Sequence, residues 1–61
     1  MKRQMIVRIE GRDFSAVSDN ADLKEAKIEC LAQLQQLVFN NLRVMPSDKT
    51  LIANMKCFKQ I

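Results

Sequence analysis

One uninterrupted helical stretch limits what this chain can fold into more than any other feature. Residues 21–45 contain neither glycine nor proline. Pro46 then ends the stretch, because proline lacks a backbone donor and disfavours helix at the residue before it. Asp19 or Asn20 can cap the start of the helix. The pattern therefore predicts one long helix that takes up much of a chain of 61 residues.

A helical wheel divides this stretch into a polar strip, a main apolar face and a second apolar flank. The polar strip consists of Glu25, Glu29, Gln33, Gln36, Asn40 and Arg43. The main apolar face, which we expect to be the core, consists of Leu23, Cys30, Leu31, Leu34, Leu37, Val38, Leu42 and Met45. The flank consists of Ile28, Ala32 and Phe39. A surface helix usually has an apolar stripe of about 100° or a little more, so the flank needs a cover of its own.

Either the same chain or a partner can provide this cover. Residues 51–58 can fold back onto the flank, or another protein chain can pack against it. Small folded chains bury only about 60% of their unfolded surface, and they gain stability from disulfides, metals or partners. We therefore expect self-association or a protein partner. The predicted contact residues are Ile28, Ala32, Phe39, Met55 and Phe58.

The N-terminal part has the pattern of a β-hairpin. Residues 4–10 largely alternate between apolar and polar side chains and include β-branched residues, which predicts a strand. Gly11 suits the first central position of a two-residue type II′ loop at positions 11–12. This turn would place Ile9 opposite Phe14, with a short second strand over residues 14–17.

The last segment, residues 48–61, fits two different elements. As a helix, it places on one face Leu51, Ile52, Met55 and Phe58. As a strand, it places on one face Leu51, Ala53, Met55, Cys57 and Ile61. A capping residue, Ser47, and the Ala, Met, Lys and Gln content favour the helix. The sequence thus predicts a single α+β domain over residues 1–61, with an N-terminal β-hairpin, one long amphipathic helix and a C-terminal helix, or a third strand (ββαβ) in its place.

Side chains that carry catalysis are scarce. The chain has no His, Tyr or Trp, and a nucleophilic cysteine usually needs a nearby base such as histidine. Zinc needs about four ligands at short spacing, which Cys30 and Cys57 do not supply. There is no glycine-rich phosphate loop. We expect a protein that is not an enzyme and that uses no cofactor, metal or small-molecule substrate.

The apolar runs are too short for a membrane or for secretion. A membrane span needs about 20 apolar residues, and the run after the basic start is broken at Arg8. We therefore expect a cytoplasmic protein without membrane contact and with both thiols reduced. Cys30 is expected in the core, and Cys57 is expected to be partly exposed.

Positive charge is concentrated at the start of the chain. Four of the ten basic residues lie in the first twelve positions, where only Glu10 opposes them. The stretch Gln4–Ile9 is similar to the short strand of ribbon-helix-helix repressors, and this resemblance implies that Gln4 and Arg8 face the bases. A predicted hairpin and a single long helix depart from that family's two helices. The predicted nucleic-acid contacts are Lys2, Arg3, Gln4, Arg8 and Arg12.

Two functional hypotheses follow from the sequence. In the first, the chain is a small non-enzymatic interaction protein, a regulator or inhibitor that binds another macromolecule and works as a homodimer. In the second, it is a dimeric DNA-binding regulator that uses the basic N-terminal strand, as paired β-ribbons do.

Overall fold

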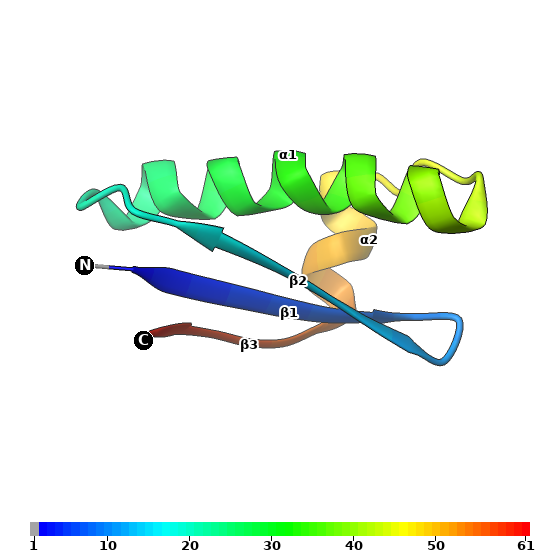
Figure 1. Ribbon diagram of the computed structural model, residues 1–61, viewed down its shortest axis with the longest axis horizontal. Coiled ribbons are helices and arrows are strands. Elements are labelled where there is room, and N and C mark those ends of the chain that lie inside the picture. Colours follow the sequence, from blue (N-terminus) through cyan, green and yellow to red (C-terminus); the bar gives the residue numbers. More distant parts are fainter. Residues whose placement is uncertain (1) are drawn as a thin grey trace.

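The chain folds into a three-stranded antiparallel sheet with two helices on one side of it (Figure 1). The computed structural model describes residues 2–61. In chain order the elements are β1 (Arg3–Ile9), β2 (Arg12–Ser18), α1 (Leu23–Leu42), α2 (Asp48–Ala53) and β3 (Met55–Gln60). The strand order is β2-β1-β3, so the first strand is the central one. This is the predicted α+β fold with an N-terminal hairpin and one long helix.

The hairpin turns one position earlier than the sequence pattern indicated. Glu10 and Gly11 both have positive φ, 51° and 77°, as the two central residues of a type I′ turn do. Ile9 therefore lies opposite Arg12 and not opposite Phe14. The prediction of a Gly11–Arg12 loop was wrong because it allowed only glycine to adopt the left-handed conformation. Here a glutamate adopts it as well.

The side chains of the hairpin stay on their predicted faces despite this change of register. Val7 lies opposite Phe14, whereas the predicted turn would have moved its partner by two positions. Side chains alternate with a period of two along a strand, so an even shift keeps each of them on its own face. Val7 and Phe14 are accordingly both buried.

The long helix α1 is shorter at both ends than predicted. Its cap is Asp22, whose carboxylate accepts hydrogen bonds from the backbone N–H groups of Lys24 and Glu25 at 2.9 and 3.1 Å. At its other end, Arg43 takes a left-handed φ of 60° and donates its backbone N–H to the carbonyl of Phe39. The helix thus ends before Pro46, and residues 43–47 form a loop.

The C-terminal segment contains both of the elements that the sequence allowed. Its first half is helix α2, where the Ser47 side chain caps the helix by accepting a hydrogen bond from the N–H of Thr50 at 3.2 Å. Its second half is strand β3, which pairs with β1. The register of this pair shifts between Ile6, opposite Cys57, and Val7, opposite Met55. The shift leaves Lys56 as an extra residue in β3, a β-bulge.

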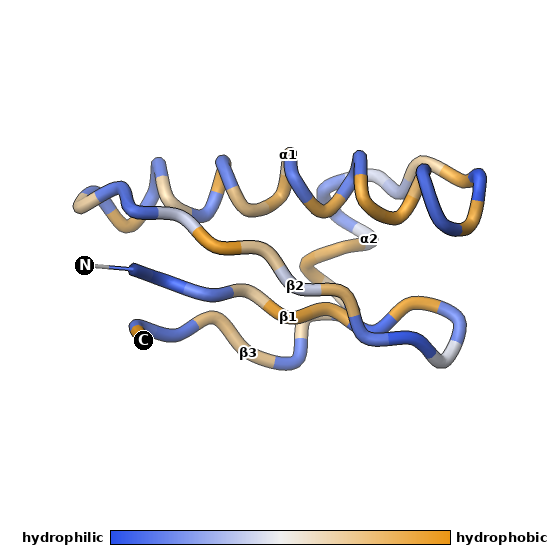
Figure 2. The backbone as a smooth tube through the Cα atoms, in the orientation of Figure 1, coloured by the Kyte–Doolittle hydropathy of each residue, from blue (hydrophilic) through white to orange (hydrophobic). Residues whose placement is uncertain are grey.

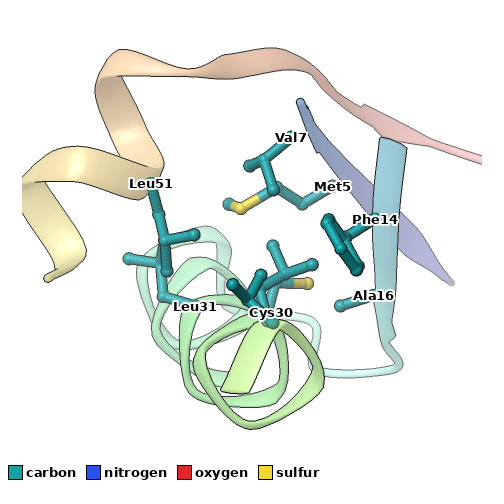
Figure 3. Packing of buried hydrophobic residues seen from close by; sticks show 9 residues of the cluster. Met5, Val7, Phe14, Ala16, Cys30, Leu31 and Leu51 are labelled. Carbon is teal, nitrogen blue, oxygen red and sulfur yellow. The ribbon is translucent and has the colours of Figure 1, made fainter. Parts of the chain in front are cut away.

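The core lies between the sheet, α1 and α2 (Figure 3). Hydrophobic residues of α1 face the strands (Figure 2). Leu51 of α2 is fully buried and closes the side of the core away from β2 (Figure 3). The core consists of Met5, Val7, Phe14, Ala16, Cys30, Leu31, Leu34, Val38 and Leu51.

Two residues that we expected in the core are on the surface. Leu23 is 57% exposed and Met45 is 60% exposed. Leu23 is the first residue of α1, and Met45 lies in the loop after the helix. The helical period that predicted their burial ends before Met45, and Leu23 lies at the N-terminal end of α1.

Candidate interaction surface

The sheet has one face that neither helix covers (Figure 1). Met5, Val7, Phe14 and Ala16 are buried toward the helices, so the alternate side chains of β1 and β2 point the other way. We call this outer side the open face. Its side chains are Gln4, Ile6, Arg8, Asp13, Ser15, Val17, Lys56, Cys57 and Lys59.

The middle of the open face is apolar. Ile6 lies opposite Ser15 on β2 and opposite Cys57 on β3, and it is half-buried although no helix packs on it. Val17 is the diagonal neighbour of Ile6 on β2 and is 37% exposed. We call Ile6, Val17 and Cys57 the apolar centre.

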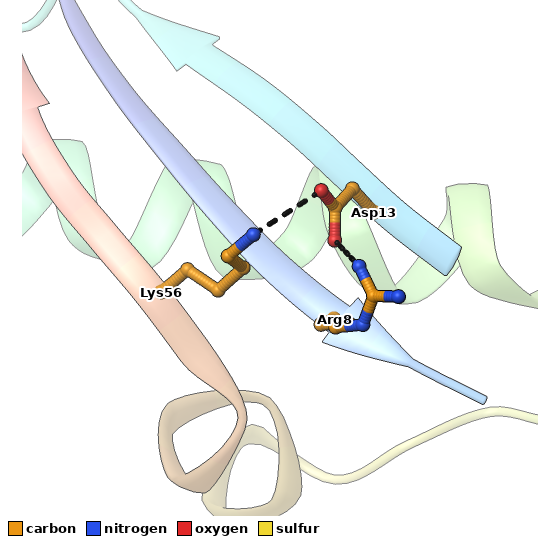
Figure 4. A network of polar contacts seen from close by, with 3 residues as sticks. All are labelled: Arg8, Asp13 and Lys56. Atoms are coloured by element: carbon orange, nitrogen blue, oxygen red, sulfur yellow. Dashed lines mark hydrogen bonds and ion pairs between the residues drawn. The ribbon is translucent and has the colours of Figure 1, made fainter. Parts of the chain in front are cut away.

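One end of the open face carries a cluster of three charges (Figure 4). Arg8 Nη1 donates to Asp13 Oδ1 at 3.0 Å, and Lys56 Nζ lies 3.4 Å from Asp13 Oδ2. The three residues come from three different strands, and their side chains are about half exposed. The bulge in β3 explains why Lys56 reaches this face, since a bulge re-aims a side chain.

The two cationic neighbours of Asp13 affect the pKa of its carboxyl group. Burial by itself would raise its pKa, but hydrogen bonds and positive charge from Lys56 and Arg8 outweigh this effect, and the pKa lies below its ordinary value. Asp13 is therefore an anion at neutral pH. The cluster keeps one net positive charge, because two cations share one anion.

The other end of the open face is also positive. Lys59 lies opposite Gln4, and within residues 2–61 it belongs to no ion pair. Lys2 extends this end, because its carbonyl accepts a hydrogen bond from the N–H of Ile61 at 2.8 Å and so continues the ladder. Cationic side chains thus flank the apolar centre at both ends.

Charge is divided between the two layers of the molecule. The strands and their turns, residues 2–18 and 54–61, hold six basic and two acidic side chains. Residues 19–53, which contain both helices, hold four basic and five acidic side chains. The sheet layer is therefore at +4 and the helix layer at −1. The modest net charge of +3 conceals this separation.

The structure separates the five predicted nucleic-acid contacts. Lys2, Gln4 and Arg8 belong to the open face or its extension. Arg3 points toward the helix layer, where its guanidinium donates to two backbone carbonyls at 3.2 and 3.3 Å. Arg12 lies at the hairpin end, opposite Ile9.

Lys56 and Lys59 join the open face, although the sequence did not single them out. The helical interpretation of residues 48–61 placed Lys56 on the outside of a helix. The alternative strand interpretation grouped Met55 with Cys57 on one face and left Lys59 unassigned. Nothing in the sequence marks the bulge, which is what brings Lys56 to the same face as Cys57.

The structure also separates the five residues that were predicted to contact another protein chain. Ile28 is 52% exposed on α1, and Ala32 is exposed one turn further on. Phe39 is half-buried. Met55 and Phe58 are half-buried and pack against the core from β3. We call the exposed pair Ile28 and Ala32 the helix flank.

A network of hydrogen bonds fastens α1 to the end of β2. Glu29 accepts from the Ser18 hydroxyl at 2.6 Å and from the Asn20 amide at 3.0 Å. These two bonds lower the pKa of Glu29 below its ordinary value. The Gln33 amide donates to the carbonyl of Val17 at 2.9 Å. These polar groups hold the two layers together, so we do not assign them to binding.

The two cysteines have different surroundings, and both are free thiols. Cys30 is fully buried, and its burial and the nearby charge of Glu29 raise its pKa. Cys57 is half-buried on the open face. Among residues 2–61, no three potential ligands gather into a metal site.

Other proteins give no guide to the role of these surfaces. Comparisons with protein families, curated proteins and solved structures yield no match. Within the part of the chain that the structure describes, no helix has the length and apolar character needed to cross a bilayer. The function is therefore argued from the surfaces themselves.

Proposed function

We propose that this chain is a small non-enzymatic interaction protein, a regulator or inhibitor, that binds another macromolecule through the open face of its sheet. The observation that carries the proposal is the arrangement of this face. A half-buried Ile6 lies at its middle, and charged side chains lie at both ends. An apolar middle with a polar rim is the usual anatomy of a protein interface.

The proposal includes self-association through a different surface. The helix flank, Ile28 and Ala32, is exposed on α1 and is not covered by residues 51–58. A chain of this length has a small core, and covering the flank with a second copy would add apolar burial.

The proposal also places the protein in the cytoplasm. The free Cys57 thiol on the open face supports a reducing compartment, where such thiols persist.

Capture from a cell lysate tests the use of the open face. The immobilised wild-type chain is compared with Ile6→Ser, which removes the middle of the open face. Ile52→Ser serves as the matched control, because it makes the same chemical change at a position of α2 that is 46% exposed and belongs to neither proposed surface. We expect a partner that the wild type and Ile52→Ser retain and that Ile6→Ser loses.

The opposite result would contradict the proposal. If Ile6→Ser retains every molecule that the wild type captures, the open face is not the binding surface. Circular dichroism establishes that each variant is folded. Val17→Ser repeats the test at a more exposed position of the apolar centre if Ile6→Ser does not fold.

A further inference from the structure

We propose that the open face takes an acidic segment of a partner protein, with an apolar side chain on the apolar centre and carboxylates at its two ends. This inference rests on the proposed function and adds the chemistry of the partner. It is carried by the charges at both ends of the face, by the side chains at its middle and by its size.

The charges select an anionic partner. Arg8, Lys56 and Lys59 with Lys2 contribute four cations, and Asp13 contributes the one anion of this face. Asp13 already neutralises one cation of the cluster. The remaining positive charge is split between the two ends, so a partner with carboxylates on either side of an anchor would be complementary at both.

The middle of the face favours a protein over a nucleic acid. Proteins that bind single strands on a surface use aromatic side chains on which bases stack. Here Phe14 and Phe58 are on the core side of the sheet, and Phe39 is on α1. In their place the open face presents Ile6 and Cys57, which suit an aliphatic anchor.

A second copy of this chain does not fit the same face. Stacking two open faces about a two-fold axis through Ile6 would bring positive ends against positive ends, whichever way the strands run. The size of the face is a separate argument for a short segment. Three strands of six or seven residues span roughly 20 by 14 Å, an area of roughly 280 Å², whereas each partner in a standard protein–protein interface contributes roughly 800 Å².

Selection from a random peptide library displayed on phage tests the inference, because the library needs no identified partner. The wild-type chain is immobilised, and enriched peptides are synthesised for fluorescence anisotropy. We expect peptides that combine Asp or Glu with one aliphatic residue. We expect Lys59→Glu to weaken their binding about fivefold, because it removes an exposed ion pair and adds a like charge. Lys49→Glu is the matched control, with the same charge change on α2.

Several outcomes would overturn the inference. Enrichment of neutral or basic peptides, or of none, would exclude an acidic segment. Equal weakening by Lys49→Glu would reduce the effect to net charge. Random-sequence duplex DNA that displaces the peptides and binds more tightly would make the face a nucleic-acid site. A sedimenting mass that halves in Ile6→Ser would assign the face to a second copy.

The failure of this inference can be told apart from the failure of the proposed function. If the lysate partner is lost by Ile6→Ser but retained by Lys59→Glu, the open face binds a partner that is not acidic. If the partner is retained by both variants, the open face is not the binding surface at all.

Discussion

At the scale of single residues, the hairpin turn shows strain that a substitution can relieve. Glu10 has a φ of 51°, in a region where a residue with a Cβ is disfavoured. Asn and Gly are the preferred pair for a type I′ turn. We expect Glu10→Asn to raise the free energy of unfolding by a few tenths of a kcal/mol, up to about 1 kcal/mol. Urea denaturation measures this change.

The neighbouring glycine gives the converse test. Gly11 has a φ of 77°, and a Cβ added there would meet nothing within 4 Å. Gly11→Ala should therefore cost about 1 kcal/mol through backbone conformation alone, without a clash. A neutral effect of both substitutions would mean that this turn does not limit stability.

The turn also shows how much of the local structure a single residue predicts. Gly11 correctly indicated that the chain reverses near this position. It did not fix the register, because the cost of a left-handed glutamate is only about 1–2 kcal/mol and the pairing of Val7 with Phe14 can offset it. The pairing of the two strands determined which two residues form the turn, and the turn residues by themselves did not.

At the scale of the elements, the Arg8–Asp13–Lys56 cluster links all three strands and should make stability depend on pH. The pKa of Asp13 is lowered in the folded state. A lowered pKa contributes stability above the unfolded pKa, and this contribution is lost as the pH falls through the folded pKa. We expect Asp13→Asn to be less stable than the wild type at neutral pH, with the difference shrinking in acid. Urea denaturation from neutral to acidic pH measures it.

An exposed aspartate outside the sheet provides the control. Asp19 belongs to no ion pair within residues 2–61, and Asp19→Asn makes the same chemical change. If the two variants follow the same pH profile, the cluster does not stabilise the fold.

The elements differ in how far the sequence revealed them. The long run without Gly or Pro identified α1, and most of its polar strip is exposed. The C-terminal segment was harder, because a helix of six residues and a strand of six residues follow each other with only Asn54 between them. The apolar residues of this segment therefore partly fit the pattern of a helix and partly fit the pattern of a strand. Two of the four cations of the open face, Lys56 and Lys59, lie on β3, so the candidate site could be predicted only as far as β1.

At the scale of the whole molecule, the two exposed surfaces can be tested separately. We expect the wild-type chain to sediment with the mass of two chains at high concentration, through the helix flank. Ile28→Ser should give the mass of one chain, because it removes an apolar side chain that is 52% exposed. Ile6→Ser should leave the mass unchanged. A wild-type chain that sediments as a single copy at every concentration would exclude the homodimer.

Strand order has a consequence for when the open face forms. The central strand β1 is synthesised before β3, its neighbour on one side. While residues 55–61 are still inside the ribosome, β1 has only β2 as a partner, and Lys56 and Lys59 are not in place. The open face is therefore completed only after these residues emerge, so the proposed binding of a partner through this face requires β3 to have paired with β1.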